Sequence, residues 1–74
     1  MNKERREMLR RVLESIEKSK DDIQNIYDEE EEAMDNLPES FEDAKSEMEE
    51  NLSYLNDVID YLNSATDEIC EIIG

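Results

Sequence analysis

The sequence contains no histidine, and it has only one glycine, one proline and one cysteine. Without histidine, neither a Ser-His-Asp triad nor the Glu-x-x-His motif of di-iron helical bundles can form. The only glycine is Gly74, so the central glycine of an EF-hand calcium loop has no counterpart. Cys70 cannot form an internal disulfide, which favours a reducing, cytoplasmic location. We expect its thiol to be partly buried beside the helix contact and inert, rather than redox-active or intermolecular.

Long apolar runs and positive charge are also scarce. No apolar stretch approaches the roughly 18 residues of a membrane span, and the charged N-terminus lacks the apolar core of a secretion signal. The formal net charge is −15, from 23 acidic and 8 basic residues. Nucleic acids and anionic membranes are themselves negative, so direct binding to either is disfavoured and a basic protein partner is favoured.

The charges are unevenly distributed along the chain. Seven of the eight basic residues and four acids precede residue 21, which gives this part a net charge of +3. The other nineteen acids and Lys45 give residues 21–74 a net charge of −18. The acids are densest between Asp28 and Glu50, where twelve carboxylates accompany one lysine. The folded chain should therefore have a strong dipole and one acidic end.

Apolar residues recur with a seven-residue period on both sides of Pro38, which predicts two amphipathic helices and an all-α fold. The helix contact predicted for the first helix consists of Leu9, Val12, Ile16, Ser19, Ile23, Ile26, Glu30, Ala33 and Leu37. The contact predicted for the second helix consists of Phe41, Lys45, Met48, Leu52, Leu55, Ile59, Leu62, Thr66, Ile69 and Ile73.

Pro38 separates the two helices, because proline disfavours helical geometry at the residue before it. We expect one domain over residues 1–74, with helix 1 at about 3–36, the turn at about 37–40 and helix 2 at about 40–73. Ser40 followed by Asp43 resembles a capping box at the start of helix 2. A connection of about four residues makes the helices antiparallel. The prediction is an antiparallel two-helix hairpin, coiled-coil-like in its packing.

The two repeats also fit one register. Facing residues of an antiparallel hairpin have numbers with a constant sum, and pairing Leu37 with Phe41 sets this sum at 78. Glu30 and Lys45 then interrupt the core at neighbouring layers. They either form an ion pair that fixes the register or mark where the turn end opens to water. The basic start of helix 1 is placed beside Asp60, Asp67, Glu68 and Glu71.

The chain has more apolar residues than one helix contact uses. Leu13, Tyr27 and Met34 flank the contact on helix 1, and one side of helix 2 carries Tyr54, Val58, Tyr61, Ala65 and Ile72. Two helices alone hardly offset the entropy of ordering so short a chain. We therefore expect either self-association, as a homodimer that forms a four-helix bundle, or capture of another protein. Tyr54, Val58 and Tyr61 are candidate partner-binding residues, since tyrosine brings contact area at low entropy cost.

The acidic segment has the charge density of a nucleic acid. Residues 28–50 carry a net charge of −11. Folded into a hairpin they occupy roughly 16 Å of axis, or about one charge per 1.5 Å, against about one per 1.7 Å in duplex DNA. Solvated acidic helices are also common without any such role. The acids that we assign to partner binding are Asp28, Glu29, Glu31, Glu32, Asp35, Glu39, Glu42 and Asp43.

The segment Asp28-Glu-Glu-Glu-Glu-Ala-Met-Asp-Asn-Leu-Pro-Glu-Ser40 resembles a stretch in small, acidic, largely uncharacterised helical proteins of Firmicutes and their phages. The resemblance covers the second half of helix 1, the turn and the heptad character of helix 2. It implies an antiparallel helical hairpin and an origin in a mobile element. Small acidic phage proteins often inhibit host defence, anti-CRISPR proteins among them, so the resemblance favours an inhibitor.

The sequence thus predicts a non-enzymatic, acidic protein-binding module. Its partner is expected to be a basic, nucleic-acid-binding protein, which it blocks by charge mimicry as a phage or anti-defence inhibitor. The alternative is a purely structural, self-associating helical bundle without an external ligand. We predict no catalytic residue, no cofactor and no metal site, with adventitious divalent binding at Asp28–Glu32 as the metal alternative.

Overall fold

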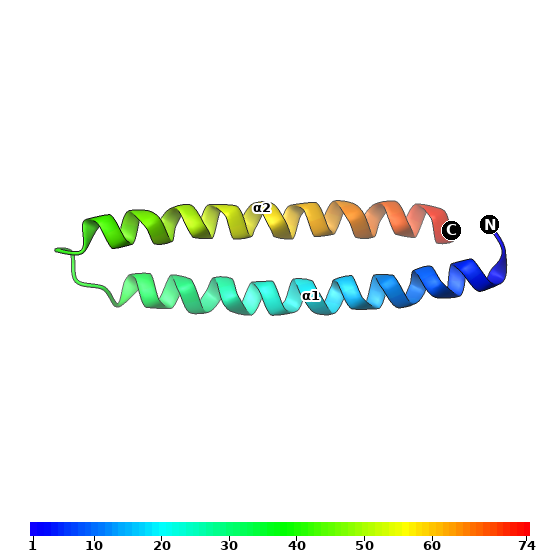
Figure 1. Cartoon of the computed structure of the whole chain (residues 1–74), viewed down its shortest axis with the longest axis horizontal. Helices are drawn as coiled ribbons and strands as arrows, with labels where there is room; N and C mark the ends of the chain where they lie inside the picture. The colour runs from blue at the N-terminus through cyan, green and yellow to red at the C-terminus, as the bar shows by residue number, and fades with distance from the viewer.

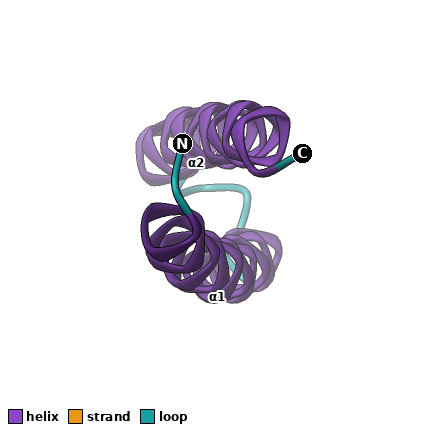
Figure 2. Ribbon diagram, turned by 90° about the vertical axis from the view of Figure 1, so that its right-hand side faces the viewer, coloured by secondary structure: helices purple, strands orange, loops and turns teal.

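The computed structural model describes residues 1–74, and it consists of two α-helices and no strand (Figure 1). Helix α1 spans Lys3–Asp35 and helix α2 spans Glu42–Ile73. They run antiparallel along a rod of 59 × 14 × 12 Å, with both termini at one end and the turn at the other (Figure 1). Seen along the rod, the two helices form a single layer with nothing packed on either broad side (Figure 2). The predicted all-α helical hairpin is confirmed.

Both ends of α1 are capped by asparagines. Asn2 is the N-cap, and its side-chain oxygen accepts a 2.9 Å hydrogen bond from the backbone N–H of Arg5. This bond satisfies one of the N–H groups that a helix start leaves without a partner. Asn36 is the C-cap, and its backbone N–H donates to the carbonyl of Glu32 at 3.1 Å. Helix α1 therefore ends at Asp35, with Asn36 and Leu37 between it and Pro38. This is consistent with the restriction that proline imposes on the residue before it.

The predicted capping box at the start of α2 is wrong. Phe41 is the N-cap, and no side chain caps the helix. Ser40 lies instead inside a tight turn, closed by a 3.0 Å hydrogen bond from the N–H of Phe41 to the carbonyl of Pro38. Because this turn uses Ser40, α2 begins at Glu42, and six residues rather than about four connect the helices.

The side of α1 that packs on α2 differs from the predicted one. Its partly buried residues are Leu9, Leu13, Ile16, Lys20, Ile23, Tyr27, Glu30, Met34 and, just after the helix, Leu37. The predicted Ser19 and Ala33 are exposed, and so are Val12 (46%) and Ile26 (51%). Helix α1 is thus turned so that the residue following each of these four positions faces α2.

Side-chain size explains this rotation. Leu13, Tyr27 and Met34 bury more apolar area than the Val12, Ile26 and Ala33 that precede them. Lys20 joins them because its aliphatic stem can be buried while its ammonium group stays polar. The Lys20 side chain is only 18% exposed. Its Nζ donates to Asn63 Oδ1 at 2.6 Å and pairs with Glu17 Oε2 at 3.1 Å.

The contact side of α2 is the predicted one, except at Phe41. Every other predicted position is partly or fully buried, and Ala65 is partly buried as well. Phe41 is 53% exposed because it precedes the helix. Only two residues are fully buried, Leu52 with 7% and Thr66 with 5% of their surface exposed. The Thr66 hydroxyl donates to the Asn63 carbonyl at 2.8 Å, so its burial leaves no polar atom unpaired.

One hydrogen bond joins the two helices, from Lys20 to Asn63. The covered residues of the two helices include the predicted facing pairs Leu9 with Ile69, Ile16 with Leu62 and Ile23 with Leu55. The same covered residues also pair one step further along, so the sum of 78 stays a prediction.

The hairpin has an overhang at each end. Helix α1 begins beyond the last turn of α2, and α2 begins beyond the last turn of α1 (Figure 1). No salt bridge joins the two helices: the three that form lie within α1, between Glu7 and Asp22. Glu30 and Lys45 therefore form no ion pair, which was one of the two alternatives for them, and the basic start of α1 forms no salt bridge with the acids of α2.

Candidate protein-binding surfaces

The two sides of the hairpin can be distinguished by heptad position. With Leu13 and Leu52 at position a, the e positions of both helices lie along one side and the g positions along the other. The hydrogen bonds of Lys20 support this assignment, because Glu17 and Asn63 both occupy e positions. The e side is polar and consists of Lys3, Arg10, Glu17, Gln24, Glu31, Glu42, Glu49, Asn56, Asn63 and Cys70.

The opposite side lacks charge over nearly its whole length. We call it the uncharged face, and it consists of Val12, Ser19, Ile26, Ala33, Ala44, Asn51, Val58, Ala65 and Ile72. None of these nine residues is charged, although 42% of the residues in the chain are. Arg5, at the start of α1, is the one charged residue at a g position. Eight of the nine are exposed. An exposed strip of this composition on a small protein indicates an interaction surface.

The amount of exposed surface supports the same conclusion. The accessible surface of the chain is 5771 Å². A compact monomer of this mass is expected to expose only about 4,800 Å². The radius of gyration, 17.1 Å, likewise exceeds the roughly 11 Å of a compact domain of this length. A single layer of two helices therefore leaves about 1,000 Å² that another protein surface could cover.

The three predicted contact residues of α2 border or belong to the uncharged face. Val58 lies within it, and Tyr54 and Tyr61 lie at its edge, at heptad position c. Tyr54 is 59% and Tyr61 73% exposed. The hydroxyl of Tyr54 donates to Glu50 Oε1 at 3.1 Å, while the body of its ring remains uncovered. All three side chains are accessible to a partner.

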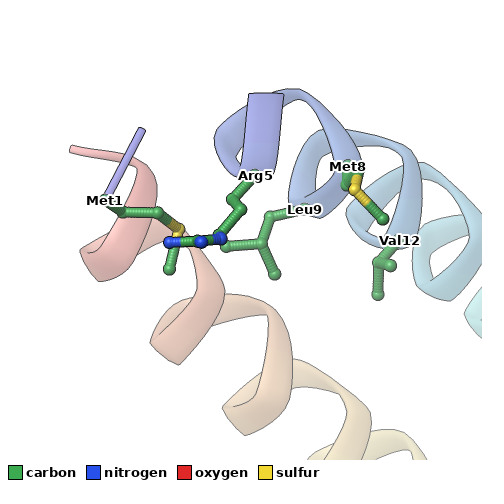
Figure 3. A pocket seen from close by; sticks show the side chains of 5 residues that line it. All are labelled: Met1, Arg5, Met8, Leu9 and Val12. Carbon is green, nitrogen blue, oxygen red and sulfur yellow. The ribbon is translucent and has the colours of Figure 1, made fainter. Parts of the chain in front are cut away.

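The sequence did not point to a second apolar site at the overhang of α1. Met1, Arg5, Met8, Leu9 and Val12 line an open hollow of about 310 Å³ (Figure 3). Met1 is 58% and Met8 63% exposed. The hollow continues the uncharged face past the end of α2. It depends on how far α1 extends past the end of α2 (Figure 1), which the heptad repeats do not give.

The acidic tip, defined as residues 28–50, is the third candidate surface. The eight acids assigned to it as partner-binding residues are all exposed, whereas Glu30 is partly buried against α2. None of the twelve carboxylates of the tip forms a salt bridge. The last turn of α1 contains no basic residue. Its acids therefore also oppose the helix dipole, which favours positive charge at a helix C-terminus.

This crowding of charge makes the stability of the tip dependent on salt. We expect the helix content and the thermal midpoint to rise when sodium chloride is increased from low to physiological concentration, because salt screens exposed charges. Far-UV circular dichroism at several salt concentrations measures both. Sodium sulfate and sodium chloride compared at equal ionic strength separate screening from salt-specific effects. A midpoint that falls as salt rises would contradict the unpaired state of the tip.

Two further sequence-based expectations concern isolated residues. Cys70 is exposed, so the expectation of a partly buried thiol is wrong. The rotation of α1 places its e positions, not bulky seam residues, on the side of Cys70. No group of three or more carboxylate or thiol side chains is placed so that it could hold a metal ion. Neither helix is long and apolar enough to cross a membrane.

Comparison with known proteins adds no functional assignment. The chain matches no protein-family model, and no curated protein or solved structure is significantly similar to it. The resemblance of residues 28–40 to acidic phage proteins stays a prediction.

Proposed function

We propose that this chain is a non-enzymatic protein-binding module whose acidic tip docks on a basic surface of another protein. The unpaired state of the tip carries the proposal. Its twelve carboxylates form no salt bridge within the chain, because all three salt bridges lie between Glu7 and Asp22. Carboxylates without a salt bridge inside the chain are free to pair with arginine and lysine from outside, and their field speeds the encounter.

The partner that fits best is a nucleic-acid-binding protein. The tip is a narrow rod end with about one charge per 1.5 Å of axis, close to the density of duplex DNA. Such a rod can enter a basic channel and exclude DNA or RNA from it. The chain would thus act as an inhibitor by charge mimicry. The resemblance to acidic phage proteins favours a mobile-element inhibitor of a host defence system, anti-CRISPR activity included.

A second candidate function is structural. The uncharged face and the surplus of exposed area favour pairing of hairpins into a four-helix bundle. In this case self-association is the whole function, and the acids maintain solubility. The two candidates are compatible in one molecule, because the uncharged face and most acids of the tip are different surfaces. Homodimerisation is part of our proposal in either case.

A pair of charge-matched variants tests the first candidate. The tip variant carries Glu29→Gln, Glu31→Gln, Glu32→Gln and Asp35→Asn. The control carries Asp57→Asn, Asp60→Asn, Asp67→Asn and Glu71→Gln, all at exposed positions of α2 outside the tip. Both variants lose four negative charges. Each is immobilised and incubated with host lysate, and captured proteins are eluted first with duplex DNA and then with salt.

We expect the wild-type chain and the control to retain a basic protein that DNA elutes, and the tip variant to retain at least about tenfold less of it. Equal retention by the tip variant and the control would show that total charge, and not the tip, governs binding. If no protein is retained by the wild-type chain, charge mimicry is rejected and the structural candidate is favoured.

A further inference from the structure

We infer that a second copy of the chain covers the uncharged face, and that the two hairpins lie antiparallel, with the turn of each beside the termini of the other. This inference deepens the self-association proposed above and rests on it. It specifies the face, the direction and the level at which the two copies meet. An external partner is not needed for it.

The exposed area fits a dimer. Each chain exposes about 1,000 Å² more than a compact protein of its mass. Two copies together can therefore bury about 2,000 Å², which lies at the upper end of the range for a specific interface of standard size. Neighbouring helices would be antiparallel both within and between the copies, as in most four-helix bundles.

The sizes of the side chains favour the antiparallel direction. Along α1 the uncharged face alternates between large and small residues, in the order Val12, Ser19, Ile26 and Ala33. Along α2 it alternates in the same way over Asn51, Val58, Ala65 and Ile72. A two-fold axis midway along the face and perpendicular to the rod stacks each helix on its own copy in the opposite direction.

With this axis between Ser19 and Ile26, Val12 meets Ala33 and Ile26 meets Ser19 between the two copies of α1. Cores pack well when large and small residues alternate across facing positions. An axis along the rod, with both turns at one end, would instead stack α1 on α2.

Charge selects the same direction. Residues 28–50 carry −11 and residues 1–20 carry +3. Turns at one end would place two acidic tips side by side, which like-charge repulsion opposes. In the antiparallel pair, the basic overhang of α1 lies beside the acidic tip of the other copy, and Arg5 comes level with Ser40. No residue before Glu7 forms a salt bridge within its own chain. Lys3, Arg5 and Arg6 are therefore available to pair with acids of the other copy.

The apolar ends of the hairpin match in the antiparallel pair as well. Phe41, at the turn, is 53% exposed. The hollow lined by Met1, Met8 and Val12 lies at the opposite end of the rod (Figures 1 and 3). Antiparallel pairing brings the Phe41 of each copy to the end where the other copy has this hollow. It also places the Tyr61 residues of the two copies next to each other, close to the two-fold axis.

The first test is the molar mass in solution. We expect the wild-type chain to have about twice its monomer mass of 8.8 kDa in light scattering after size exclusion. Val58→Glu places a charge on the uncharged face and should weaken the dimer about 100-fold or more. Asn56→Glu adds the same charge on the polar side of the same helix and should leave the dimer intact. A monomeric wild-type chain, or equal dissociation by both variants, would overturn the inference.

The second test fixes the direction and does not require a variant that weakens the dimer. In a Cys70→Ser background, Tyr61→Cys and Ser40→Cys are each treated with a short bis-maleimide reagent. The antiparallel pair predicts covalent dimers for Tyr61→Cys and none for Ser40→Cys, whose copies lie at opposite ends. The reverse result would reject the antiparallel direction but keep self-association. Crosslinking of neither variant, in a chain that has dimer mass, would reject the proposed face.

Discussion

Leu52→Ala is expected to cost about 2–4 kcal/mol in the free energy of unfolding. Leu52 is the only apolar residue of the chain that is fully buried, with 7% of its surface exposed. It lies on the side of α2 that packs on α1. A protein of this length has a total stability of only about 4–11 kcal/mol. Losing one such side chain should therefore unfold a substantial fraction of the molecules at room temperature.

Urea unfolding followed by circular dichroism, at one fixed protein concentration, measures this cost. Leu37→Ala is the matched control, because it removes the same atoms from a partly buried residue in the turn. We expect the control to cost less than half as much. Similar costs for both variants would show that the contact between the helices does not hold the hairpin together at Leu52. The prediction also fails if Leu52→Ala costs less than about 1 kcal/mol.

Glu30→Leu should have a large effect in the opposite direction. Glu30 is the only acid of the tip that packs partly buried against α2. Leucine there would extend the apolar contact towards the turn and remove one of several neighbouring negative charges. Burial of part of a leucine side chain should stabilise the fold by about 1–2 kcal/mol, with a further small gain from reduced repulsion.

Glu31→Leu separates burial from charge in this experiment. It makes the same replacement one residue further along, at an exposed position on the polar side. We expect its effect on the free energy of unfolding to stay within about 0.5 kcal/mol. Both variants are measured by urea unfolding at the same protein concentration. Equal stabilisation by the two would attribute the whole effect to charge and contradict the packing of Glu30 against α2.

The natural glutamate at this position fits the proposed function. A leucine would make the hairpin more stable, yet the chain has an acid in its helix contact and eleven further acids around it. Stability given up at a surface is typical of binding sites. The same acids should make the tip the first part of the molecule to fray, while the contact around Leu52 remains intact.

The sequence by itself determined the two helices, the turn and the antiparallel direction. The seven-residue repeats on either side of Pro38 allow few other arrangements, and the proline restricts where the first helix can end. It also determined the distribution of charge and identified Tyr54, Val58 and Tyr61, which proved to be exposed. The contact side of α2 was predictable because its large residues occupy one clear a/d pattern.

Only the tertiary structure decided the rotation of α1 and the uncharged face. On α1 two patterns one residue apart were available, the one through Val12 and Ile26 and the one through Leu13 and Tyr27. The second pattern includes Lys20, which a rule based on apolar residues alone rejects. It prevails because larger side chains bury more area and because Lys20 finds polar partners in Asn63 and Glu17. The rotation of α1 determines which of its residues remain exposed for a partner. This rotation depends on how the two helices pack against each other, so it cannot be read from α1 alone.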